Sequence, residues 1–135
     1  DSMHGGTNSL PRLTGELDGT VSALMNDLRD RGLLGTTMIV VTTEFGRTPK
    51  VKGNGGRDHH PNGFSAMLAG GGVKGGIAVG ETDENGRDPF PEYEPRDLHA
   101  TIATALGMTG TKIRRLPGRP SFLGGKPKPI QEILA

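Results

Sequence analysis

Apolar residues recur at steps of three and four positions between Leu13 and Leu28, which places their side chains on one face of a helix. The pattern predicts an amphipathic helix that ends in a glycine cap at Gly32. Residues 38–43 then form a continuous apolar and β-branched run without polar alternation. Such a run favours a strand that is covered on both faces, as in a parallel sheet. A helix followed by a buried strand is typical of an α/β fold.

The rest of the chain alternates between short apolar segments and turns. Residues 64–69 predict a second strand, and residues 77–79 predict a third strand or one arm of a hairpin. The acidic, proline-rich segment 81–95 predicts a surface loop. A second helix is expected to open at Pro95 and to close at Gly107. The glycine clusters within 70–76 predict tight turns, because the lysine-containing pattern of a phosphate-binding P-loop is absent.

Composition narrows the possible functions. A length of 135 residues suits one domain, and only 32% of the residues are hydrophobic, which leaves little material for a core. With 16 Lys and Arg against 15 Asp and Glu, and few aromatics, we expect no nucleic-acid binding. No apolar run reaches the roughly 20 residues of a membrane span. The absence of cysteine excludes disulfides and thiolate metal sites.

Side chains that ligate metals gather where the predicted strand gives way to loops. Glu44 follows the strand at its carboxyl end, where open α/β sheets place their ligands. The next loop carries a carboxylate and two imidazoles, and the N-terminus adds one of each; these residues are Asp58, His59, His60, Asp1 and His4. Together they would form an N/O site for zinc or a similar divalent ion, which would polarise an ester oxygen or activate water.

Each of these residues also has a purely structural interpretation. Glu44 by itself would be solvated or salt-bridged, and the histidine pair would equally well pack or hydrogen-bond within its loop. Arg47 and Arg57 would either clamp a phosphate or sulfate or neutralise nearby carboxylates. The residues alone leave both interpretations open.

Four motifs in one order carry a resemblance to a known family. They are TEFGRTP at 43–49, GRDHHP at 56–61, LAGGGVKGG at 68–76 and DLHATI at 97–102. In this order they resemble the C-terminal third of the domain-of-unknown-function-1501 family, sulfatase-like bacterial proteins of the alkaline phosphatase superfamily. The similarity extends over nearly the whole chain, including the helix before the first strand.

The resemblance implies a fold and a place within it. The superfamily fold is a three-layer α/β sandwich with a mostly parallel sheet and metal ions at the carboxyl ends of its strands. Residues 1–135 would be a single partial domain, the C-terminal segment of this sandwich, which needs the missing N-terminal part of its own domain. The hydroxyl or thiol nucleophile of the superfamily belongs to that part. Relatives typically carry an export signal, so a periplasmic or exported location is implied.

The resemblance also implies roles for the candidate residues. The ligands of a divalent metal, zinc or calcium, would be Asp1, His4, Glu44 and His59, with Asp58 and His60 behind them or as alternates. Arg47 and Arg57 would lie near the anion of a phosphate or sulfate ester, either a small molecule or a polymer. Phe45 stands where the superfamily typically has a histidine ligand, and this departure supports an altered metal site. It also leaves open a non-catalytic binding or structural module as the alternative to a hydrolase.

Overall fold

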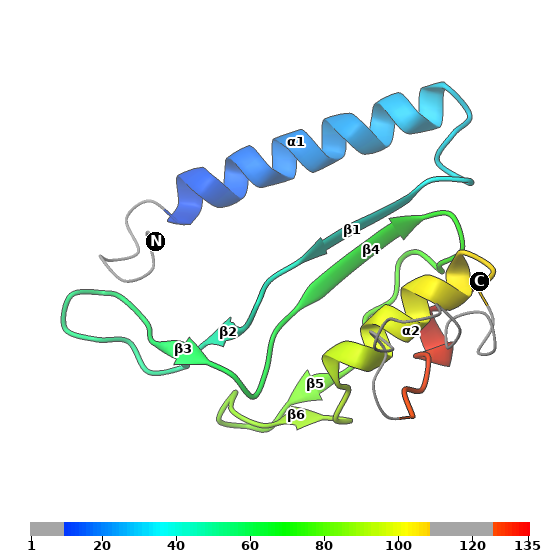
Figure 1. The fold of residues 1–135 in the computed structure, drawn as a ribbon. Coiled ribbons are helices and arrows are strands. Elements are labelled where there is room, and N and C mark those ends of the chain that lie inside the picture. The colour runs from blue at the N-terminus through cyan, green and yellow to red at the C-terminus, as the bar shows by residue number, and fades with distance from the viewer. Residues whose placement is uncertain (1–9, 109–125) are drawn as a thin grey trace, which may run out of the picture.

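Two α-helices, one short 3₁₀ helix and three small antiparallel sheets make up residues 10–108 and 126–135, which the computed structural model describes (Figure 1). Candidate ligands Asp1 and His4 lie outside these residues. In chain order the elements are α1 Leu10–Asp30, β1 Met38–Thr42, β2 Gly46–Arg47, β3 His59–His60, β4 Ala66–Gly70, β5 Glu81–Thr82, β6 Pro89–Phe90, α2 Pro95–Ala105 and η1 Gln131–Ile133.

Helix α1 confirms the predicted amphipathic helix and its glycine cap. Gly32 has a φ of 69°, a left-handed conformation that costs a glycine little, and its amide donates to the Arg29 carbonyl at 2.9 Å. The Leu33 amide donates to the Leu28 carbonyl at 2.8 Å, which completes the cap. No residue of α1 is buried, and Leu13 and Leu17 are 37% and 51% exposed. Within the described residues, therefore, no part of the chain buries the apolar face of α1.

Strands β1 and β4 confirm the two longer predicted strands, although their pairing differs from the expectation. They pair antiparallel, from Met38 opposite Gly70 to Thr42 opposite Ala66. The apolar residues of β1 are half-buried rather than covered on both faces. Every strand pair among residues 10–108 and 126–135 is antiparallel, so the described part of the chain contains no parallel sheet. It establishes a mixed α/β chain with small antiparallel sheets.

The hairpin after β4 lies further along the chain than predicted. Residues 77–79 do not form a strand; the arms are β5 and β6, inside the segment predicted to be a loop. A carboxylate holds the turn between them, because Asp83 Oδ1 accepts the amides of Arg87 at 2.5 Å and Asp88 at 3.1 Å. The prediction for 77–79 was wrong because it followed apolar character, whereas side-chain hydrogen bonding in the turn determines the hairpin.

Helix α2 carries the small core. Its first turn has a capping box, in which Glu94 and Asp97 each accept the other's backbone amide. The buried apolar residues of the described chain are Leu98, Ala100 and Ala103, all on α2, and Thr101 beside them is 0% exposed. Among the described residues, neither helix combines the length and apolar character needed to cross a membrane.

Residues 128–135, here called the strap, fasten the end of the chain to α2 and to the loop after β4 (Figure 1). At one end the Lys128 amide donates to Asp97 Oδ1 at 2.8 Å, and the Ile130 amide donates to Thr101 Oγ1 at 2.8 Å. At the other end the Lys74 amide donates to the carbonyl of Ile133 at 2.9 Å. The strap thus joins three segments that are far apart in the sequence.

Candidate functional site

The hairpin of β2 and β3 brings two of the sequence motifs, 43–49 and 56–61, together just beyond the carboxyl end of β1 (Figure 1). Arg47 pairs with His59, and Gly46 pairs with His60. A close approach to the segment before β4 holds the hairpin in place, since the Gly46 amide donates to the Gly63 carbonyl at 2.7 Å. A Cβ at position 46 would lie 2.2 Å from that oxygen, so the approach requires glycine.

An aromatic contact links β3 to Phe45, the residue just before β2. The rings of Phe45 and His59 have centroids 4.1 Å apart with an interplanar angle of 35°. The guanidinium carbon of Arg47 lies 5.8 Å from the centroid of the Phe45 ring, within the range of a cation–π contact. Phe45 and Arg47 are half-buried, and His59 is exposed. The structure therefore brings the predicted anion-binding arginine and the predicted histidine ligand together around one phenyl ring.

Arg57 fastens the loop between β2 and β3. Its Nη1 donates to the carbonyl oxygens of Thr48 at 2.8 Å and Pro49 at 2.5 Å. Its own carbonyl accepts a bond from Arg47 Nη1 at 3.3 Å. This nitrogen of Arg57 is used for structure, and the substrate-binding role of the residue stays a prediction.

The two alternate ligands have structural contacts of their own. Asp58 pairs with Lys52, with Oδ1 and Nζ 2.5 Å apart, although both side chains are about half exposed. Nε2 of His60 donates to the Arg87 carbonyl at 2.6 Å, which joins β3 to the turn between β5 and β6. These contacts match the structural interpretation of both residues, and their part in a metal site is a prediction.

The described residues do not form a complete metal site by themselves. Among them, no group of three or more histidine or acidic side chains is arranged to hold an ion. Glu44 is exposed, and in the hairpin register His59 lies opposite Arg47 rather than Glu44. The proposed set of Asp1, His4, Glu44 and His59 includes two residues outside the described chain, so the set as a whole stays a prediction.

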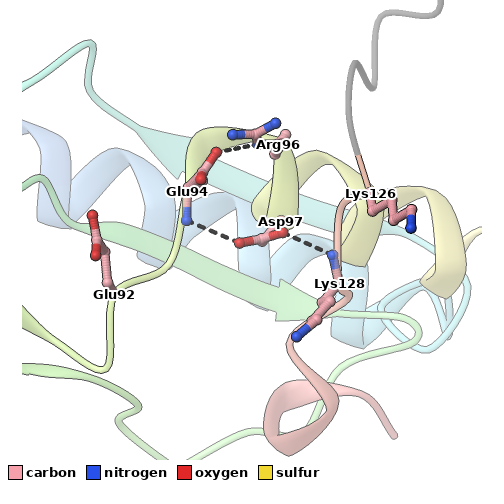
Figure 2. A pocket seen from close by; sticks show the side chains of 6 residues that line it. All are labelled: Glu92, Glu94, Arg96, Asp97, Lys126 and Lys128. Atoms are coloured by element: carbon pink, nitrogen blue, oxygen red, sulfur yellow. Dashed lines mark hydrogen bonds and ion pairs between the residues drawn. The ribbon is translucent and has the colours of Figure 1, made fainter.

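A charged pocket at the start of α2 was not predicted from the sequence. It measures about 380 Å³ and is lined by Glu92, Glu94, Arg96, Asp97, Lys126 and Lys128 (Figure 2). Arg96 Nε forms an ion pair with Glu94 Oε2, which raises the pKa of the guanidinium. Asp97 accepts the amides of Glu94 at 3.0 Å and Lys128 at 2.8 Å. The local sequence carries no signal for this pocket, because its lining comes from segments about 30 positions apart.

Next to this pocket, the carboxyl-terminal segment meets the loop before α2. Tyr93 Oη donates to Glu132 Oε1 at 3.5 Å. Partial desolvation, together with the nearby Glu132 carboxylate, raises the pKa of the Tyr93 phenol above its usual 10.0. Asp97 and Tyr93 are therefore structural partners of the strap.

Comparison with known proteins identifies the family. The family model described as "Protein of unknown function (DUF1501)" matches residues 1–134. No curated protein and no solved structure matches the chain. Because the matched range covers almost the whole sequence, the chain belongs to the DUF1501 family.

Proposed function

We propose that this DUF1501 chain is the C-terminal segment of an alkaline-phosphatase-like domain, and that this domain binds and hydrolyses a phosphate or sulfate ester with the help of a divalent metal. The observation that supports the proposal most is the β2–β3 hairpin. It places Arg47 opposite His59, just beyond the carboxyl end of β1. In open α/β sheets of mostly parallel strands, the arrangement proposed for the whole domain, ligands commonly bind at the carboxyl ends of strands.

The proposal assigns a separate task to each group. The planar guanidinium of Arg47 suits two oxygens of a phosphate or sulfate group, and Arg57 would add positive charge nearby. Glu44 and His59, completed by Asp1 and His4, would hold zinc or calcium, with Asp58 and His60 supporting them. A metal bound there would stabilise negative charge on the ester. The nucleophile would come from another part of the same domain.

The packing of the chain supports the proposal that a further part of the same domain is needed. No residue of α1 is buried, the apolar residues of β1 are only half-buried, and the buried apolar residues of the described chain all lie on α2. Burial of apolar side chains is the main stabilising contribution to a domain. Further strands and helices of the same domain would cover α1 and the β1–β4 sheet. Export to the periplasm or beyond remains part of the proposal through the family resemblance.

A second function is favoured by one specific observation. Phe45 occupies the position where the superfamily has a metal ligand, and its ring makes a tilted contact with His59. No three-ligand group exists among the described residues. A chain altered in this way would keep the fold and bind a surface polymer or a protein partner without catalysis. Metal content and ester hydrolysis separate the two functions.

The experiment uses the full-length protein, purified in zinc- and calcium-containing buffers without chelator. We expect a stoichiometric metal ion and hydrolysis of an aryl phosphate or aryl sulfate. Each of the variants Glu44→Ala and His59→Ala should lose both. His99→Ala is the matched control, because its imidazole is exposed on α2, away from the hairpin. Wild-type protein without metal and without hydrolysis would reject the hydrolase and leave the binding module.

A further inference from the structure

The backbone next to Phe45 is held at Gly46. Phe45 lies three residues after the end of β1, and the following residue, Gly46, is hydrogen-bonded to Gly63 and paired with His60. A side chain at position 46 would collide with the Gly63 carbonyl, so this approach leaves the backbone little freedom to shift. The Phe45 ring therefore starts from a well-defined backbone position.

The Phe45 ring contacts two of the proposed functional side chains. One of them, His59, is exposed and belongs to a strand of only two residues. The ring contact at 4.1 Å restricts the imidazole, and the same phenyl ring lies 5.8 Å from the Arg47 guanidinium. Arg47 is also bonded through Nη1 to the Arg57 carbonyl. One phenyl ring thus contacts both a cation and an imidazole.

We propose that Phe45 is a positioning residue, whose ring orients two groups of the proposed site: the His59 imidazole that would bind the metal and the Arg47 guanidinium that would bind the anion. The inference deepens the proposed function and rests on it for the identity of the anion, a phosphate or sulfate group. It also explains why an aromatic side chain at position 45 is compatible with a working site: Phe45 acts through its neighbours and does not contact the metal. A leucine at 45 would fill much of the same space without a π-face.

The test compares wild type with Phe45→Leu and Phe45→Tyr in the full-length protein. The imidazole resonances are recorded by NMR with ¹³C-labelled histidine, and His59 is assigned with a His59→Asn variant. Inorganic phosphate and inorganic sulfate are then titrated separately, and thermal unfolding is measured for each variant. Phe45→Tyr keeps the aromatic face, so it is the conservative control.

We expect the His59 resonance of Phe45→Leu to move away from its wild-type position, because the ring current of Phe45 is lost. Anion affinity should fall about 3- to 10-fold, less than the full worth of the aromatic pair and the cation–π contact, because both contacts also stabilise the unliganded protein. Phe45→Tyr should keep both the His59 resonance position and the anion affinity of wild type. A folded Phe45→Leu protein with an unchanged His59 resonance and unchanged affinity would overturn the positioning role.

Failure of the proposed function gives a different result. If wild type binds neither anion while its His59 resonance still depends on the ring at position 45, the anion-binding function is wrong and the orienting contact stands. If phosphate binds to wild type but the His59 resonance and the anion affinity do not change on substitution of Phe45, the anion-binding function stands and the positioning role is wrong. If Phe45→Leu fails to fold, the resonance and affinity of Phe45→Tyr decide, and a loss of either in that folded variant would contradict the role.

Discussion

Replacing Thr101 with valine removes the hydroxyl that joins α2 to the strap. Thr101 is 0% exposed, and its Oγ1 donates to the Asp97 carbonyl at 2.7 Å while accepting the Ile130 amide at 2.8 Å. Valine has nearly the same shape, so the change leaves no large cavity and isolates the hydrogen bonds. The Ile130 amide would lose its acceptor in a part-buried position. A buried donor without a partner costs about 1–3 kcal/mol, and we expect Thr101→Val to destabilise the protein by about 2 kcal/mol.

Thr104→Val provides the matched control in the same helix. Thr104 Oγ1 donates to the Ala100 carbonyl at 2.8 Å and holds no strap amide, so its loss should cost about 0.5 kcal/mol or less. Urea unfolding of the full-length proteins measures the difference, and hydrogen exchange of the Ile130 amide locates it. Equal destabilisation by the two valines, with Ile130 exchange unchanged in Thr101→Val, would refute the reasoning.

Three further predictions concern the hairpins and the strap. Gly46→Ala should destabilise the protein by about 1–3 kcal/mol, because its Cβ would lie 2.2 Å from the Gly63 carbonyl oxygen. The control Gly53→Ala has open space around the new Cβ and should not destabilise the protein. Similar urea midpoints for the two variants would count against the close approach at Gly46. The backbone amide of Arg87, followed by that of Asp88, lowers the pKa of Asp83 below 3.8. The contribution of Asp83 to stability is therefore present above that pH and is lost as pH falls through the lowered pKa. The Arg87 amide resonance should follow that loss, and an amide resonance that does not respond in acid would contradict the prediction. The pKa of Tyr93 is raised, so the contribution of this residue to stability is complete below about pH 10 and is lost as pH rises through the raised pKa. The pKa is measured from the phenolate absorbance of wild type after subtraction of the absorbance of Tyr93→Phe. A midpoint at or below 10.0 would reject the raised pKa.

The predicted helices and the two longer strands follow from local patterns. The three- and four-residue spacing of α1 and the apolar run of β1 involve near neighbours in the chain, so the sequence determines these elements directly. The same holds for the cap at Gly32, whose positive φ favours glycine. The apolar character of 77–79 was misleading, because a short apolar run without a compatible turn does not form a strand.

The candidate site was only partly predictable. The sequence supplied the residue types, including Arg47 and His59, and the expectation that the two motifs would meet at the end of a strand. It carried no signal for the short strands β2 and β3, since two residues are too few to show a period. It also carried no signal that the Phe45 ring would contact both Arg47 and His59.

The sequence by itself determined the two α-helices, the two longer strands and which side chains are available for chemistry. Only the tertiary structure decided that β1 pairs antiparallel with β4, that Arg47 lies opposite His59, and that Thr101 holds the amide of Ile130. The physical reason is the range of the interactions. Helix periodicity and caps are governed by residues within about four positions. The β1–β4 and β2–β3 pairings and the Thr101–Ile130 bond join residues 12 to 32 positions apart, and the chain must close those loops before the contacts can form.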